Sequence, residues 1–254
     1  MVKVEDIEVM GWRKAIKGMR NAMNSWDRMD SGFCTGDKCF YTSECWNQSF
    51  KGKEESCPLR EYDEAGNNKM MKAEGGFAGY ILGPNDLDLA CRLIKAGPEH
   101  RKFLRMIHIQ MDITGPLYWW KEMDTYKVAT VENSCSTMHR IHAKEFELSD
   151  FSYDRLDDFS LNHLNETIKY LNSMRTMFLL DKNRHYWWQL IQLLPSSYNQ
   201  LRTWDGSMET VLSILHQRAH HKLDTDWEPF RQACFNNIPY CKEFYEAMYG
   251  KEEN

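Results

Sequence analysis

The chain has 254 residues, of which 42% are apolar and 13% aromatic, a composition that indicates a folded protein rather than a disordered one. Its net charge of −5 argues against duplex nucleic acid as the main partner, because phosphate backbones require a broad basic surface. No apolar run approaches the roughly 20 residues of a membrane-spanning helix, and the N-terminus lacks a signal-peptide pattern. We therefore expect a cytoplasmic protein with no membrane partner.

The start of the chain predicts two regular elements and then an insertion. A short strand with an irregularity in its middle is indicated by Val2, Val4, Ile7 and Val9. From Trp12 onward, apolar residues recur at the three-and-four spacing of an amphipathic helix. Residues 31–79 are rich in Gly, Lys, Glu, Asn and Cys and show no period. We interpret 31–79 as a Cys-containing insertion within a single domain that spans 1–254.

The clearest predicted elements lie in the middle of the chain. The stretch "GPNDLDLACRLIKAG" predicts a helix that begins near Pro84 and ends at Gly97. In "FLRMIHIQMDITGP", apolar and polar residues alternate from Ile107 to Ile113, which is the period of a half-buried strand. Pro116 is expected in the first turn of the next helix.

The C-terminal half is predicted to be helical. Apolar residues recur at helical spacing in "LNHLNETIKYLNSMRTMFLL", "YWWQLIQLL" and "SMETVLSILHQRA", and further helices are expected in "DWEPFRQACF" and "PYCKEFYEAMYG". Together with the strands, these helices predict a mixed α/β (α+β) fold with few strands and many helices.

Two groups of residues admit both a binding and a structural interpretation. Four cysteines of the insertion could hold a structural zinc ion, although a disulfide or free thiols are alternatives: Cys34, Cys39, Cys45 and Cys57. The aromatic groups "YWW" (118–120) and "HYWWQ" (185–189) could stack on a flavin or a base, or could belong to the core or to a subunit interface. The chain contains no Gly-rich phosphate loop and no G-x-S-x-G element.

The order of these elements resembles that of the flavin-dependent thymidylate synthases. The segments "IKAG", "IHIQMDITGP" and "LYWWKEMDTYKVATVENSCSTMH" run in the same order as that family's helix end, strand and signature helix. Further along, Leu194-Pro195, Arg218 and Trp227-Glu228 correspond to the family's Leu-Pro, L-x-x-R and W-E elements. The resemblance covers most of the chain outside 31–79 and implies a central twisted, mostly antiparallel sheet flanked by several helices.

The signature R-H-R-x-x-S-x-N-E-x-S-x-R is strongly altered in this chain. Aligning Pro116 with the family's Pro places Thr125, Tyr126 and Lys127 at Arg-His-Arg and Glu132-Asn133 at Asn-Glu. Thr and Tyr cannot replace the bidentate phosphate clamp of Arg. The resemblance nevertheless implies two groups of candidates. The nucleotide-binding candidates are Arg218, Lys127, Thr130, Asn133 and Cys135, and the flavin-binding candidates are Tyr118, Trp119, Tyr126 and His100.

The resemblance implies one of two functions. The first is binding of a pyrimidine deoxynucleotide such as dUMP and transfer of a one-carbon unit to its base, with FAD as cofactor and NADPH and methylenetetrahydrofolate as co-substrates. The second is a catalytically inactive, family-derived scaffold or interaction protein that no longer binds FAD. An Arg218 that simply pairs with a carboxylate would be consistent with the second. By the same resemblance we expect a homotetramer.

Overall fold

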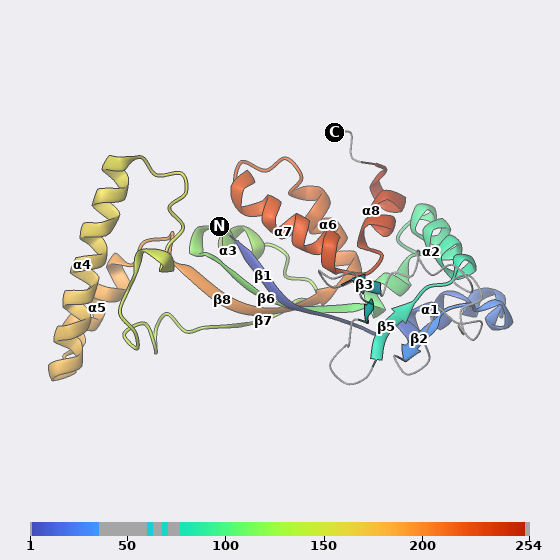
Figure 1. The fold of residues 1–254 in the computed structure, drawn as a ribbon, viewed down its shortest axis with the longest axis horizontal. Coiled ribbons are helices and arrows are strands. Elements are labelled where there is room, and N and C mark those ends of the chain that lie inside the picture. Colours follow the sequence, from blue (N-terminus) through green and yellow to red (C-terminus); the bar gives the residue numbers. More distant parts are fainter. Residues whose placement is uncertain (1, 36–59, 63–67, 71–76, 252–254) are drawn as a thin grey trace. The chain divides into compact units, whose positions relative to one another are not determined.

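The structure is a computed structural model that describes residues 2–35, 60–62, 68–70 and 77–251 (Figure 1). Its contacts divide the chain into two compact units. The first comprises Met1–Val9 and His108–Cys241, and the second comprises Met10–Ile107 and Lys242–Asn254. The prediction of a single domain stays a prediction, and the two units are described separately below.

The first unit contains a four-stranded sheet in the order β1-β6-β8-β7 (Figure 1). The strands are β1 (Lys3–Met10), β6 (His108–Pro116), β7 (Val131–Ser134) and β8 (Asn199–Ser207). The central strand β8 pairs antiparallel with β6, where Met111 faces Trp204, and antiparallel with β7, where Glu132 also faces Trp204. This arrangement confirms the predicted α/β class with an antiparallel sheet.

Two of these strands agree with the sequence analysis. In β6, Ile109, Met111 and Ile113 are buried while the residues between them are at least partly exposed, as the alternation predicts. In β1, Asp6 has a φ of 47°, a conformation that interrupts an extended strand, and it accounts for the predicted irregularity. Pro116 ends β6, and the next helix begins one residue later than expected, at Leu117.

Strands β7 and β8 were not predicted, and the reason is chemical. Burial alternates along β8, but the residues on its more buried face are Gln200, Arg202, Trp204 and Gly206. Only one of them is a large apolar residue, so the hydropathy of the segment does not alternate even though its burial does. The edge strand β7 is short and largely exposed, and it therefore carries no apolar signal.

Three helices of the first unit pack beside the sheet (Figure 1). They are α3 (Leu117–Met123), α6 (Met208–Gln217) and α7 (Asp224–Asn237). Trp119 of α3 is fully buried, and its ring centroid lies 4.8 Å from that of Trp227 and 5.7 Å from that of Phe230, both on α7. This aromatic cluster fixes the end of α3 beside the start of α7, which is where the candidate site lies.

A second helix pair has its own small core. The helical spacing predicted both α4 (Asp158–Asp181) and α5 (Arg184–Leu193), and the two helices pack side by side (Figure 1). With the preceding loop they bury an apolar cluster of Ile141, Phe146, Phe151, Leu164, Ile168, Leu171 and Leu190.

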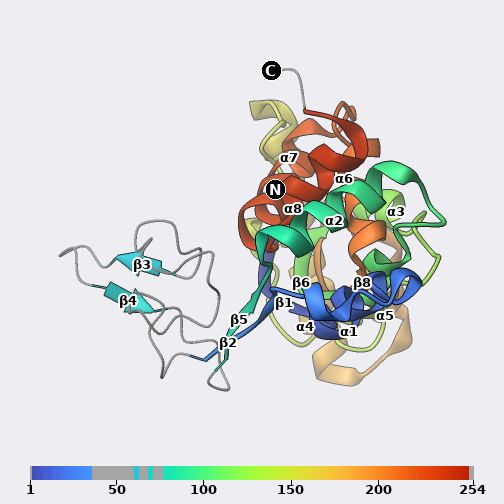
Figure 2. The same cartoon turned by 90° about the vertical axis from the view of Figure 1, so that its right-hand side faces the viewer.

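The second unit contains the predicted N-terminal helix α1 (Trp12–Met19), α2 (Pro84–Ala96) and most of α8 (Cys241–Tyr249). Gly97 follows α2 with a φ of 115°, which confirms the predicted glycine at the helix end. Strand β2 (Gly32–Thr35) pairs antiparallel with β5 (Phe77–Ile81), and β3 (Arg60–Tyr62) with β4 (Asn68–Met70) (Figure 2). Short 3-10 turns occupy Asn21–Met23, Trp26–Arg28, Lys102–Met106 and, in the first unit, Leu148–Asp150.

Candidate functional site

Arg218 immediately follows α6 and is held by the end of that helix. Its backbone N–H donates to the carbonyls of Ile214 and His216. The buried residues Val211, Leu212 and Leu215 fix α6 against the core, so the position of Arg218 is set by a rigid element rather than by a free loop.

The Arg218 guanidinium lies against the C-terminal end of α3. Its Nη1 donates to Oε2 of Glu122 at 3.0 Å, and its Nη2 lies 3.3 Å from the Glu122 carbonyl oxygen and 3.4 Å from Oγ1 of Thr125. The same group sits 5.3 Å from the ring centroid of Tyr126 and 5.0 Å from that of Trp227, within the range of cation–π attraction. Arg218 therefore joins the end of α3 and the loop after it to the start of α7.

His221 approaches the same carboxylate. Its Nε2 lies 3.7 Å from Oε2 of Glu122, and its ring packs edge-on to Trp227 with the centroids 6.1 Å apart. Its Nδ1 accepts a hydrogen bond of 3.2 Å from the backbone N–H of Leu223. Because Nδ1 is an acceptor, a neutral His221 carries its proton on Nε2, facing Glu122.

A pocket of about 300 Å³ opens beside Arg218. It is lined by Arg218, Ala219, His221, Asp224, Thr225, Trp227 and Glu228. The guanidinium is suited to an anionic ligand, whereas the carboxylates of Asp224 and Glu228 oppose a large negative charge there. Trp227 is only 1% exposed, so its ring offers no open face for stacking. The pocket thus favours a ligand with a single anionic group positioned at the arginine.

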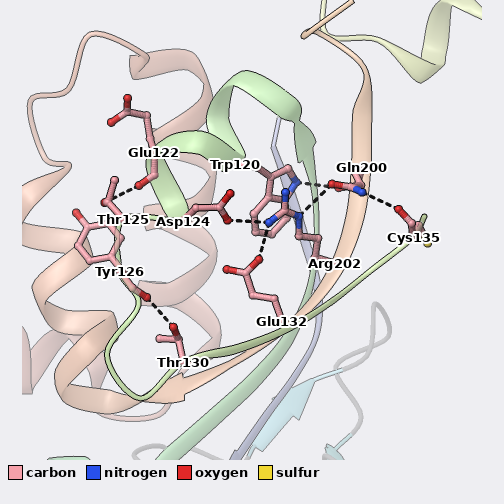
Figure 3. A network of polar contacts seen from close by, with 10 residues as sticks. All are labelled: Trp120, Glu122, Asp124, Thr125, Tyr126, Thr130, Glu132, Cys135, Gln200 and Arg202. Carbon is pink, nitrogen blue, oxygen red and sulfur yellow. Dashed lines mark hydrogen bonds and ion pairs between the residues drawn. The ribbon is translucent and has the colours of Figure 1, made fainter. Parts of the chain in front are cut away.

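A second hollow, of about 360 Å³, has Tyr126 in its wall. It is lined by Asp124, Tyr126, Lys127, Thr130 and Glu132. Oγ1 of Thr130 donates to the Tyr126 carbonyl at 2.6 Å, and this bond closes the loop that carries Lys127 (Figure 3). Lys127 and Thr130 are therefore brought together with Tyr126, which also contacts Arg218.

Arg202 of β8 organises the wall next to this hollow, and the sequence analysis did not identify it. Its Nη1 donates to Asp124 at 2.7 Å and to Glu132 at 2.6 Å, and its Nε donates to Gln200 at 3.0 Å (Figure 3). The guanidinium also lies 4.3 Å from the centroid of Trp120. Two carboxylates and one ring satisfy this cation, so Arg202 acts as a structural clamp between β8, β7 and the end of α3.

Asn133 and Cys135 lie further along the same edge of the sheet. Asn133 faces Thr203 in the β7–β8 pairing and is exposed. The Cys135 carbonyl accepts a hydrogen bond of 2.6 Å from Nε2 of Gln200, while the residue itself is exposed (Figure 3). Neither lines the two pockets described above.

The flavin candidates have different surroundings. Trp119 has no exposed surface, so no face of its ring is open to a cofactor within this chain. Tyr118 is partly buried and donates to Oδ2 of Asp226 at 2.8 Å. Tyr126 borders a pocket, whereas His100 is an exposed residue of the second unit. Of these four, Tyr126 is the candidate best placed to meet a bound ring.

Burial changes the acidity of the groups around α3 and the start of α7. Burial, followed by the hydrogen bond to Asp226, raises the pKa of Tyr118 well above that of a free phenol. Burial also raises the pKa of Asp226, and the Tyr118 hydroxyl partly counteracts this by stabilising the carboxylate. For Tyr126, burial raises the pKa against the opposing effect of Arg218. Tyr118 and Tyr126 are therefore neutral hydrogen-bond donors at physiological pH.

The predicted zinc site falls almost entirely outside the described residues. Cys39, Cys45 and Cys57 are not among them, and Cys34 is described only through its place in β2. Within the described ranges, no group of three or more His, Cys, Asp or Glu side chains is arranged to hold a metal ion. The zinc site stays a prediction.

Sequence comparison identifies no relative of this chain. No family model matches it, and no curated protein matches it. Among the described residues, no helix has the length and apolar character needed to cross a membrane.

Structural comparison, by contrast, defines the fold class as that of the flavin-dependent thymidylate synthases. The chain resembles the crystal structure of thymidylate synthase X (ThyX) from Helicobacter pylori with FAD and dUMP: the TM-score is 0.59 at 13% identity, over 98% of this chain and 100% of that one. A second structure of that enzyme with FAD and dUMP gives a TM-score of 0.54 at 14% identity, over 98% of each chain. The UMP/dUMP methylase PolB from Streptomyces cacaoi, bound with 5-Br dUMP, gives 0.55 at 10% identity, over 100% of this chain and 97% of that one. The predicted resemblance in fold is thus confirmed.

Proposed function

We propose that this protein binds a pyrimidine deoxynucleotide of the dUMP type in the pocket beside Arg218. The proposal is based on the position of Arg218. Its guanidinium lines a pocket and contacts the rings of Tyr126 and Trp227, at 5.3 Å and 5.0 Å from their centroids. The three solved structures of the same fold contain dUMP or its 5-bromo derivative, which supports a nucleotide of this kind. Lys127 and Thr130 line the second hollow together with Tyr126, and we propose that they contact the part of the nucleotide that Arg218 does not reach.

We further propose that the reaction is transfer of a one-carbon unit to the pyrimidine base, with FAD, NADPH and methylenetetrahydrofolate as the reactants that the fold family implies. In such a reaction the cofactors supply the hydride and the carbon, and the protein supplies binding and orientation. In this chain the groups that would orient a ligand are Arg218 and Tyr126. The burial of Trp119 does not fit a flavin platform at that residue, so we derive no step that depends on it.

The alternative function, an inactive scaffold that no longer binds FAD, has an observation in its favour. The charge of Arg218 is paired with Glu122, and the two carboxylates that line the pocket, Asp224 and Glu228, add negative charge. The assembly as a homotetramer also stays a prediction, and light scattering of the purified protein measures it directly.

Binding of dUMP and of flavin distinguishes the two functions. We expect dUMP to raise the melting temperature of the wild-type protein, because a ligand that binds only the folded state stabilises it. Arg218→Ala should weaken dUMP binding about tenfold to a hundredfold, since a charge-assisted hydrogen bond contributes about 1.5–3 kcal/mol. Arg92→Ala, which removes an exposed arginine of the second unit, should leave dUMP affinity unchanged.

Two further measurements, the flavin absorption of the purified protein and its formation of dTMP, decide between an enzyme and a scaffold. A flavoprotein absorbs near ~450 nm, and a complete mixture of dUMP, FAD, NADPH and methylenetetrahydrofolate should yield dTMP. A colourless protein whose melting temperature responds to neither FAD nor dUMP would exclude the enzymatic function and leave the scaffold.

A further inference from the structure

One oxygen atom beside the pocket is approached by two nitrogen donors. Oε2 of Glu122 lies 3.0 Å from Nη1 of Arg218 and 3.7 Å from Nε2 of His221. The first distance is that of a charge-assisted hydrogen bond, and the second is an electrostatic contact just beyond hydrogen-bond length. Glu122 therefore holds a negatively charged oxygen where two donors that line the pocket converge.

The Arg218 guanidinium is only partly satisfied by the chain itself. Its side chain is 12% exposed, and its buried Nε has no hydrogen-bond partner among the described residues. A buried donor without a partner is costly, and such groups in folded proteins often mark the place of a ligand or of ordered water. The Arg218 guanidinium can donate to oxygen atoms in addition to those of Glu122 and Thr125.

The Glu122 carboxylate is partly open to solvent. Its side chain is 40% exposed, compared with 20% for Glu132 and 44% for Asp124, the two carboxylates bound to Arg202. Figure 3 shows the Glu122 carboxylate turned away from the Arg202 network. A half-exposed carboxylate is rehydrated when it swings away, which offsets part of the cost of separating it from Arg218.

We propose that Glu122 is a specificity-determining residue whose Oε2 occupies the subsite of a ligand phosphate oxygen. An anionic ligand then binds Arg218 only by displacing Glu122, and its oxygen meets the Nη1 of Arg218 and the Nε2–H of His221. An uncharged nucleoside offers no atom to replace the carboxylate and leaves it in place. This inference rests on the proposed function, since it assigns the phosphate of the proposed nucleotide to a defined place.

The test compares dUMP with deoxyuridine on matched variants by calorimetry. Glu122→Gln keeps the shape and an acceptor but removes the competing charge, so dUMP should bind about tenfold tighter or more, while deoxyuridine affinity should change less than about twofold. Glu228→Gln removes the same charge from the lining of the same pocket, from a residue that pairs with Arg231 rather than Arg218. It should tighten dUMP by less than about threefold, because the effect is then a screened, long-range one.

His221 provides a second check of the two-donor geometry. In the Glu122→Gln background, His221→Ala should weaken dUMP binding about threefold to tenfold, the range expected for loss of one hydrogen bond. Deoxyuridine binding should weaken less than dUMP binding, because the nucleoside has no phosphate oxygen to accept the Nε2–H. Circular dichroism and the melting temperature of each variant verify that the fold is retained.

The outcomes separate this inference from the function on which it rests. The inference is overturned if wild-type protein binds dUMP but Glu122→Gln binds it no tighter, or if Glu228→Gln gives the same gain. Equal tightening of dUMP and deoxyuridine would also overturn it, because the gain would then not lie at the phosphate. If neither ligand binds to wild type or to any variant, the proposed function itself fails.

Discussion

Two arginines of the first unit have different surroundings, and the difference suggests different roles. Arg202 is bound by two carboxylates and an amide and stacks on Trp120. Arg218 is bound by one carboxylate and retains a buried Nε without a partner in the described part of the chain. A guanidinium that is saturated by its own chain stabilises the fold, whereas one that is not can take a ligand.

Arg202→Lys should destabilise the protein. Lysine keeps the charge but lacks the planar fork that reaches Asp124, Glu132 and Gln200 together, so we expect a loss of about 1–3 kcal/mol in the free energy of unfolding. Arg155→Lys is the matched control, since Arg155 makes an exposed pair with Asp224 at 3.4 Å and should change stability by less than about 0.5 kcal/mol. Urea unfolding measures both. Equal midpoints for the two variants would contradict the role of Arg202 as a clamp.

The raised pKa of Tyr118 leads us to expect that the protein loses stability at alkaline pH. Its folded-state pKa is raised, so above pH ~10 the unfolded chain loses the phenol proton while the folded chain keeps it. The unfolded state then binds fewer protons, and stability falls as pH rises. Tyr118→Phe lacks this proton, so its stability should fall less steeply than that of wild type between pH ~10 and ~12.

The measurement for Tyr118 is the melting temperature of both proteins across that range. Tyrosines with raised pKa elsewhere, such as Tyr198, are present in both proteins and cancel in the difference. Parallel curves for wild type and Tyr118→Phe would show that the phenol titrates normally in the folded state.

At the scale of elements, the start of α2 is stabilised by a reciprocal set of hydrogen bonds. Asp30 accepts from the backbone N–H groups of Asn85 and Asp86, and Asp86 accepts from the backbone N–H of Asp30. Arg20, which follows α1, donates to Asp86 at 2.6 Å, with side chains that are 4% and 0% exposed. The Asp30 carboxylate satisfies two free N–H groups of the helix start, and both carboxylates complement its dipole.

Asp86→Ala should destabilise the protein strongly. It leaves the buried guanidinium of Arg20 without its carboxylate, and breaking a buried pair in this way costs about 3–5 kcal/mol. Asp88→Ala, two positions along the same helix, removes an exposed pair with Arg92 and should cost no more than about 1 kcal/mol. Chemical unfolding of the two variants gives the comparison. Equal losses would mean that the Arg20–Asp86 pair contributes no more than a surface pair.

The elements also show which parts of this fold a sequence can predict. The strand β6 and the helices α2 and α4 bury apolar residues at regular spacing, and that spacing predicted them. The central strand β8 was missed because Gln200, Arg202 and Gly206 lie on its more buried face and are satisfied by contacts far along the chain. Arg202 meets Asp124 across 78 positions, a distance that no local pattern reports.

At the scale of the whole molecule, the resemblance to the solved structures concerns the fold, whereas the altered signature concerns the side chains of the candidate site. The solved structures share this fold at 10–14% identity, so the arrangement of helices and strands persists while the side chains change. The sequence predicted Arg218 and Tyr126 as site residues, and the structure brings the two into contact. It did not predict Glu122 as the partner of Arg218, because that contact joins residues 96 positions apart.

The central claim is that an anionic ligand binds at Arg218 in this pocket, and a crystal structure of the protein grown with dUMP tests it most directly. We predict that the dUMP phosphate lies within hydrogen-bond distance of the Arg218 guanidinium, with the pyrimidine beside Tyr126 and the Glu122 carboxylate displaced. A dUMP molecule bound away from Arg218, with the Arg218–Glu122 ion pair intact, would contradict the account.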